Sequence, residues 1–311
     1  ERDKATQVIW GYKDFEYHFK RPPRGMWLPE TAVNLDTLEV LAEHRIDFTI
    51  LAPKQAARIR KIGSSQWDDV EGGRIETKQA YRCYLPSGRS IVLFFYDAHL
   101  STKLAFGPYT KNVKRFQQGV ENEIHRDHMK EGIIHGAVDG ETYGHHHKKG
   151  HAILKEVVGW LEKRQDVCLT NYDHFLKHHQ PTYEVEIFEN TAWSCEAGLN
   201  RWFFDDHHSY DASTIKVHKW REALRNSLDW LRERFIDVYE GQMIKYCKDP
   251  WKMRDEYITC LLDSSDKNRE QFVNRHVDSY RSVSIHDKAK IFALLEMQKM
   301  SMYMYTSCGW F

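Results

Sequence analysis

The residues best suited to chemistry in this sequence are two acids separated by one glycine. Asp139, Gly140 and Glu141 follow an apolar run at 133–138. Residues i and i+2 of a strand point to the same side, so both carboxylates are expected to face one cleft. Crowded carboxylates suit general acid/base work, because crowding raises the pKa of one while the other stays ionised. The alternative, an acidic turn that only caps the next helix, stays open.

A third acid, Glu30, ends the segment Gly25-Met26-Trp27-Leu28-Pro29-Glu30. It directly follows a Trp, a Leu and a Pro, at the expected end of a short strand. The alternative is a glutamate at a helix start, a position that the helix dipole favours. Glu30 is therefore a second candidate for carboxylate chemistry.

Short apolar runs must position these acids. They lie at 26–28, 48–51, 91–95 and 133–138, with one more possible strand at 185–188. Runs that are apolar on successive residues are typical of parallel strands buried on both faces. The first four end in polar residues: Glu30, Lys54 with Gln55, Asp97, and Asp139 with Glu141. Because the carboxyl ends of parallel strands form the active face of α/β folds, chemistry is expected there.

Helical patterns lie between and after these runs. Asn34 is expected to cap a helix with Leu35, Leu38 and Leu41 on its apolar face, and Pro53 to begin a first helical turn. Another helical face runs over 153–161. Beyond about residue 210 the spacing predicts helices over 217–238, 251–262 and 285–305. We therefore expect a catalytic α/β portion at 1–200 and a helical domain at 201–311.

Composition narrows the function classes. The 311 residues hold 45 basic and 45 acidic side chains, a net charge of zero, which argues against nucleic-acid binding. No apolar run is long enough to span a membrane. Six scattered cysteines without a C-x-x-C pair indicate reduced thiols and a cytoplasmic protein. The sequence begins at Glu1 without a methionine and ends on Phe311, so we interpret it as a segment of a longer protein.

The two acidic motifs together resemble the catalytic signature of glycoside hydrolase family 57, written Gly-x-Trp-Leu-x-Glu and Asp-x-Glu-x-aromatic-Gly-His. Further similar stretches lie at 25–33, 50–53, 85–89, 94–97, 139–147, 189–198 and 306–311. The resemblance covers most of the chain and is to a branch with an appended helical domain of unassigned function. It implies an incomplete (β/α)7-type barrel, truncated here at its N-terminus and followed by an α-helical region.

The resemblance also implies an activity and roles for the matching residues. The family contains retaining enzymes that act on α-glucans, either as hydrolases or as transglycosylases. Glu30 would be the nucleophile, Asp139 the general acid/base and Glu141 a supporting carboxylate. Such a retaining mechanism needs two carboxyl groups about 5–5.5 Å apart. The family's His-Gln-Pro motif is missing from the expected place, and we interpret His179-Gln180-Pro181 as a coincidence.

Five residues are candidates for substrate binding. Trp27 and Trp193 are expected to stack on sugar rings, although core packing is the more frequent use of a tryptophan. Asp97, His145 and His146 are expected to line the cleft and bind sugar hydroxyls. The predicted partner is a polysaccharide or oligosaccharide, with neither nucleic acid nor membrane, and the sequence predicts no oligomeric state.

Histidine clusters leave a second hypothesis open. His147 and His151 form an i, i+4 pair, and His207 and His208 lie beside Asp205 and Asp206. These patterns suit a metal-dependent carbohydrate deacetylase or a mannosidase-like enzyme. Consecutive histidines point in different directions, however, and family 57 needs no metal, so we expect neither a metal nor another cofactor. A third hypothesis is a glucan-binding module without catalysis.

Overall fold

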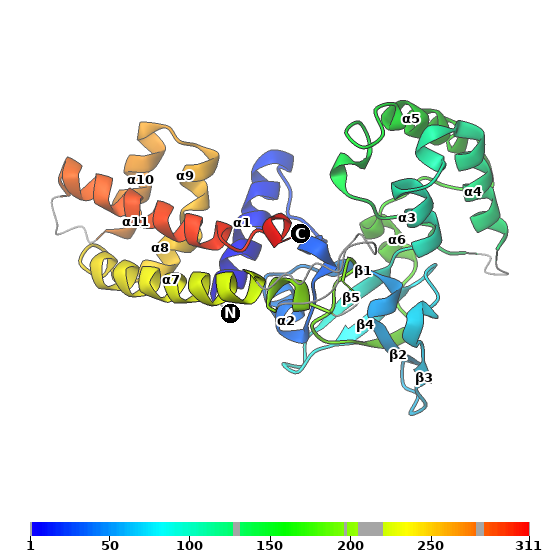
Figure 1. Cartoon of the computed structure of the whole chain (residues 1–311), viewed down its shortest axis with the longest axis horizontal. Coiled ribbons are helices and arrows are strands. Elements are labelled where there is room, and N and C mark those ends of the chain that lie inside the picture. Colours follow the sequence, from blue (N-terminus) through cyan, green and yellow to red (C-terminus); the bar gives the residue numbers. More distant parts are fainter. Residues whose placement is uncertain (1, 127–130, 196–197, 205–219, 278–282, 311) are drawn as a thin grey trace. The chain divides into compact units, whose positions relative to one another are not determined.

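The computed structural model describes residues 2–126, 131–195, 198–204, 220–277 and 283–310 (Figure 1). The chain divides into two compact units. One comprises Arg24–Trp193, and the other combines Glu1–Pro23 with Ser194–Phe311. The structure therefore groups the first 23 residues with the helical part, whereas the sequence places them in the α/β portion.

Residues 24–193 contain a mixed six-stranded sheet. Its spatial order is β1-β5-β4-β6-β2-β3. The strands are β1 Phe48–Leu51, β2 Ala56–Lys61, β3 Asp68–Asp69, β4 Ala80–Tyr84, β5 Ser90–Phe95 and β6 Tyr183–Ile187. β1 pairs with β5 in parallel, and β4 with β6, while the other neighbours are antiparallel. Parallel pairs are thus interleaved with antiparallel ones.

The predicted runs at 48–51, 91–95 and 185–188 are confirmed as strands β1, β5 and β6. The runs at 26–28 and 133–138 are extended but form no strand. Met26 N–H donates to Phe48 O at 3.2 Å. Pro29 lacks an N–H, so the backbone pairing with β1 does not continue beyond it. Ile133 N–H donates to Lys78 O, whereas His135 O accepts from Asp97 N–H. Because these bonds go to two different segments, no ladder forms.

Both faces of the sheet are covered by helices. Helix α2, Leu35–Glu43, contacts β5 and begins as predicted, with Asn34 Oδ1 accepting from Thr37 N–H at 3.0 Å. Helix α6, Tyr172–His178, packs on the other side, where the ring centroids of Phe94 and Tyr172 lie 4.7 Å apart. The expected turn at Pro53 is a single 3-10 turn, Pro53–Gln55.

Three helices form a second core in this unit. They are α3 Ala98–Ala105, α4 Val113–His125 and α5 Gly150–Leu161, which lie together in Figure 1. Their buried residues are Leu100, Leu104, Phe116, Val120 and Val157. The predicted helical face at 153–161 is confirmed as part of α5.

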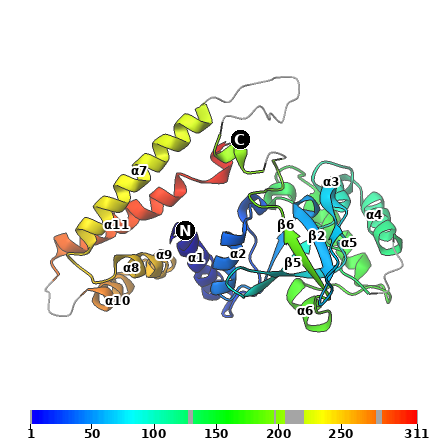
Figure 2. The same ribbon diagram turned by 90° about the horizontal axis from the view of Figure 1, so that it is seen from below.

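The other unit is helical. Its helices are α1 Arg2–Phe19, α7 Trp220–Met243, α8 Pro250–Glu256, α9 Ile258–Leu262, α10 Asp266–His276 and α11 Ile285–Tyr303. The long helices α7 and α11 run side by side (Figure 2), and Gln298 donates to Phe235 O at 3.1 Å between them. Arg254, fully buried, donates to Asp3 at 2.6 Å and to Thr6 at 2.7 Å, which fastens α1 to α8.

The predicted helices at 217–238, 251–262 and 285–305 are confirmed, except that residues 217–219 lie outside the described residues and α11 ends at Tyr303. No helix in the described ranges combines the length and the hydropathy that crossing a membrane requires. The chain is thus an α/β fold followed by an α-helical region, as the fold class predicted.

Candidate functional site

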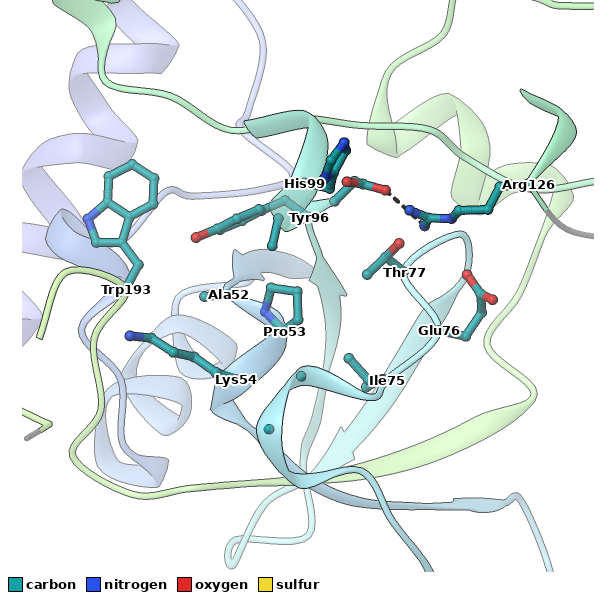
Figure 3. A pocket seen from close by; sticks show the side chains of 14 residues that line it. Ala52, Pro53, Lys54, Ile75, Glu76, Thr77, Tyr96, His99, Arg126 and Trp193 are labelled. Carbon is teal, nitrogen blue, oxygen red and sulfur yellow. Dashed lines mark hydrogen bonds and ion pairs between the residues drawn. The ribbon is translucent and has the colours of Figure 1, made fainter. Parts of the chain in front are cut away.

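A cavity of about 550 Å³ lies at the carboxyl ends of the parallel strands β1 and β5 (Figure 3). Ala52, Pro53 and Lys54 follow β1, and Tyr96, Asp97, Ala98 and His99 follow β5. The remaining lining residues are Gly72, Gly73, Ile75, Glu76, Thr77, Arg126 and Trp193. This is the edge at which α/β folds bind their ligands.

Trp193 connects this cavity to Glu30. It lines the cavity, and its indole N–H donates to Glu30 Oε2 at 3.0 Å. Its backbone N–H also donates to Glu30 O at 3.0 Å. Trp27 and Tyr96 meet the Trp193 ring edge-on, at centroid distances of 5.2 and 6.0 Å. A half-buried carboxylate and three rings therefore share one margin of the cavity.

The backbone at Glu30 is held in an unusual conformation. Glu30 has φ 57° and ψ 16°, and Thr31 has φ 48°. A positive φ is rare outside glycine, rarest for a β-branched residue, and costs roughly 1–3 kcal/mol at each position. The turn Pro29–Thr31 retains this conformation through Thr31 N–H to Leu28 O and Ala32 N–H to Pro29 O, both 2.9 Å. Such strain is typical of segments that must aim a functional side chain.

Asp139 and Glu141 lie on a turn, not on a strand. Asp139 precedes the single 3-10 turn Gly140–Thr142, so the expected i, i+2 strand geometry was wrong. Asp139 places no side-chain cap on this turn, and α5 begins only at Gly150. Helix capping therefore does not account for its carboxylate.

The surroundings of Asp139 raise its pKa above the ordinary value of an aspartate. Partial loss of hydration is the largest cause, followed by the negative charges of Glu141 and Glu30, and His146 partly offsets them. The residue is largely exposed at its turn. The charge of Glu30 thus acts on Asp139, although the two residues are far apart in sequence. A carboxyl with a raised pKa is the form required of a general acid.

Asp97 caps α3 and forms an ion pair at the cavity wall, in which Asp97 is buried and Arg126 is exposed. Its Oδ1 accepts from Leu100 N–H at 2.7 Å, and its Oδ2 lies 2.9 Å from Arg126 Nη2. Arg126 also reaches Glu123 Oε2 at 2.8 Å. Burial, then the neighbouring Asp97, raises the pKa of Glu123 to about 7. Asp97 therefore has a structural task as well as a place in the cavity.

The structure brings some predicted residues together and leaves others apart. Asp97 and Trp193 line the cavity, and Trp27 and Glu30 adjoin it through Trp193. Asp139, Glu141, His145 and His146 lie outside its lining. Both histidines are exposed, with their rings 5.0 Å apart and their amides bonded to Glu141 O.

Histidine and acidic residues do not form a metal centre within the described ranges, where no group of three or more His, Cys, Asp or Glu is placed to hold an ion. His147 Nε2 instead contacts Ala105 O at 2.8 Å. The cluster Asp205, Asp206, His207 and His208 lies outside the described residues.

Sequence reasoning missed four polar residues of the cavity: Glu76, Thr77, His99 and Arg126. The signal for His99 was present, since it follows the end of a buried strand by only a few positions. Arg126 comes after a polar helix end and Glu76 and Thr77 precede β4, which had not been predicted. Nothing local marks these three.

Comparison with known proteins adds the following. The model of Glycosyl hydrolase family 57 matches residues 1–188, and that of a domain of unknown function, DUF3536, matches 217–311. No curated protein matches the chain in sequence.

Several solved structures are similar in fold. An exo-type maltose-forming amylase from Pyrococcus sp. ST04 superposes with a TM-score of 0.64 at 16% identity, over 97% of this chain and 53% of that one. A family 57 branching enzyme from Thermococcus kodakaraensis superposes with a TM-score of 0.57 at 15% identity, over 98% of this chain and 61% of that one. The α-amylase AmyC from Thermotoga maritima superposes with a TM-score of 0.54 at 14% identity, over 97% of this chain and 63% of that one. This chain therefore spans between half and two-thirds of the length of these enzymes.

Proposed function

The chain belongs to glycosyl hydrolase family 57, and on that premise we propose that it acts on an α-glucan as a retaining glycoside hydrolase or transglycosylase. The observation that carries the proposal is the placement of Glu30. Its carboxylate receives the indole N–H of Trp193 beside the strand-end cavity, and its charge raises the pKa of Asp139. An ionised carboxylate near a protonated one is the pair that retaining glycosidases use.

The proposed reaction has two steps. In the first, Glu30 attacks the anomeric carbon while Asp139 donates its proton to the departing glycosidic oxygen, which gives a glycosyl-enzyme. In the second, Asp139 accepts a proton from water or a sugar hydroxyl, whose oxygen displaces Glu30. Two inversions restore the original configuration. Glu141 supports Asp139 by adding negative charge that keeps its proton bound.

Aromatic and polar side chains around the cavity bind the sugar in this proposal. Trp27 and Trp193 provide apolar ring surfaces for the C–H faces of a pyranose. Asp97 at the cavity wall, and His145 and His146 beyond the cavity lining, exchange hydrogen bonds with sugar hydroxyls. A neutral polysaccharide needs no electrostatic steering, which fits the net charge of zero.

Product analysis with matched variants tests this function. The purified protein is incubated with a maltooligosaccharide, and the anomeric configuration of the first product is read by NMR. We expect a retained α product, and Glu30→Gln and Asp139→Asn each to lower kcat by about 10³-fold or more. A 5-fluoro glycosyl fluoride should add one sugar mass to the peptide that contains Glu30.

Glu186→Gln is the control, because Glu186 is an exposed carboxylate that pairs with Arg58 on the sheet. It should leave turnover unchanged. Normal activity of Glu30→Gln, or an inverted product, would show the roles to be wrong. The six scattered cysteines without a C-x-x-C pair also support a reducing compartment, the cytoplasm, which cell fractionation tests.

A further inference from the structure

Gln55 is a fully buried polar residue beneath the turn that carries Glu30. Its side-chain oxygen accepts from Ala52 N–H and from Thr31 Oγ1, both at 2.9 Å. Its side-chain nitrogen donates to Thr31 O at 2.9 Å and to Thr191 Oγ1 at 3.1 Å. An amide side chain has two donor hydrogens and two acceptor sites, and all four are used. Gln55 is therefore saturated with partners.

The orientation of this amide is determined by the backbone. Ala52 N–H can only donate, so the side-chain oxygen must face it, and Thr31 O can only accept, so the nitrogen must face it. Rotation of the amide by half a turn would oppose donor to donor and acceptor to acceptor. No other uncharged side chain of the same length provides this pattern.

Its partners belong to the two segments that form the acid site. Thr31 is adjacent to Glu30 and shares its positive φ, and Gln55 binds Thr31 through both backbone and side chain. Thr191 lies two residues before Trp193, the donor to Glu30. Gln55 O also accepts from Phe188 N–H at 2.9 Å, at the end of β6. The side chain of Gln55, just after β1, thus joins the Glu30 segment to the Trp193 segment.

We propose that Gln55 is a positioning residue, which holds the strained Glu30 turn and the Trp193 segment so that the carboxylate meets its indole donor. The proposal rests on the function proposed above, in which Glu30 is the nucleophile. It assigns to Gln55 no contact with substrate. Displacement of a reacting group by about 1 Å costs about 100-fold in rate, so loss of this amide should reduce kcat far more than KM.

The variant Gln55→Met keeps the length and apolar stem of the side chain and removes all four hydrogen bonds. We expect kcat on a maltooligosaccharide to fall about 100-fold, KM to stay within about threefold, and labelling of Glu30 by the fluoro sugar to slow in proportion. Gln298→Met is the matched control. Gln298 is also a buried glutamine with bonds from both ends of its amide, but it joins α7 to α11 in the helical unit.

A milder pair of variants covers the case in which Gln55→Met fails to fold. Thr191→Val removes the hydroxyl that accepts the hydrogen bond from Gln55 Nε2, and Thr191→Ser keeps that hydroxyl. We expect Thr191→Val to lower kcat about tenfold and Thr191→Ser to restore it. Equal activity of the two would overturn the proposal.

Hydrogen exchange separates this proposal from the proposed function. The amides of Val33 and Trp193 bond across the two segments, to Thr191 O and Glu30 O at 3.0 Å. Gln55→Met, or Thr191→Val in its place, should make both exchange about tenfold faster, whereas Gln298→Met should not. If the wild type fails to turn over glucan but these amides respond, the function is wrong and the positioning stands. If both amides exchange at the same rate in the variants as in Gln298→Met, the positioning role is wrong whatever the activity.

Discussion

The indole nitrogen of Trp193 lies 3.0 Å from Glu30 Oε2, although 163 positions separate the two residues in the chain. A second bond, from the amide of Trp193 to Glu30 O, fixes the same pair through the backbone. The carboxylate is therefore oriented by the segment that follows β6, which is distant from Glu30 in the sequence. Changes on that segment should reach the chemistry at Glu30.

Trp193→Phe tests this relationship because it keeps an aromatic ring and removes the donor. A hydrogen bond to a charged group contributes about 1.5–3 kcal/mol, so we expect kcat to fall about 10- to 100-fold. The measurement is steady-state turnover of a maltooligosaccharide. Trp67→Phe, on a ring that contacts Arg58 and Arg60, should not alter it. An unchanged kcat in Trp193→Phe would mean that the indole does not orient the nucleophile.

Glu141→Gln tests the source of the raised pKa of Asp139. After partial loss of hydration, the charge of Glu141 is the next largest cause. Removing it should lower the pKa of Asp139, so the acid form is lost sooner as pH rises. We expect the alkaline limb of the kcat/KM profile to move to lower pH. Glu162→Gln, just beyond the end of α5, should leave the limb in place, and an upward movement in Glu141→Gln would contradict the assignment.

Glu123→Gln should change how stability depends on pH. Burial and Asp97 raise the folded-state pKa of Glu123 to about 7, so the folded protein holds this proton more tightly than the unfolded chain. The contribution of this group is complete below its unfolded pKa and is lost as pH rises through about 7. Relative to wild type, the Tm of Glu123→Gln should therefore increase between pH 4 and pH 8.

For Glu121, two residues earlier on α4, we expect the opposite dependence of stability on pH. Hydrogen bonds from Arg164 and His125 lower the pKa of Glu121. Its contribution is present above the unfolded pKa and lost in acid, so Glu121→Gln should melt below wild type at pH 7 and converge with it at low pH. Parallel pH profiles of Tm for the two variants would refute both assignments.

Gly25→Ala should destabilise the segment that leads to Glu30. A Cβ on Gly25 would lie 2.2 Å from the ring of Phe48, which is buried against Phe94. The ring must move, and overpacking of this kind costs about 1–3 kcal/mol in unfolding free energy. Gly159→Ala, in α5 with open space around it, should stabilise by up to about 1 kcal/mol. Urea unfolding of both variants measures the contrast.

Continuous apolar runs predicted the strands that are buried on both faces. β1 and β5 are such strands, because every residue of β1 and five of six in β5 are buried. β2 was missed, since its Ala56–Lys61 sequence is half charged and only Ala56 in it is buried. The run at 133–138 was predicted as a strand like β5, but its backbone has partners in two segments, which only the tertiary structure decides.

The site was predictable only in its residue types. Carboxylates at strand ends indicated Glu30, Asp97 and Asp139, and the motif resemblance supplied their expected roles. The positive φ of Glu30 could not be predicted, because it depends on bonds from Trp193 and the surrounding turn. Gln55 was noticed only as a polar strand end, since burial with four partners is a property of the fold.

The helical unit is assembled from both ends of the sequence, with α1 fastened to α8 by Arg254, Asp3 and Thr6. During synthesis α1 leaves the ribosome before residues 24–193, and α8 leaves it much later. The α/β unit can therefore fold before α1 meets Arg254 of α8, because domains fold as units as they emerge. Throughout that interval Asp3 and Thr6 of α1 lack the guanidinium of Arg254 that binds them in the folded protein.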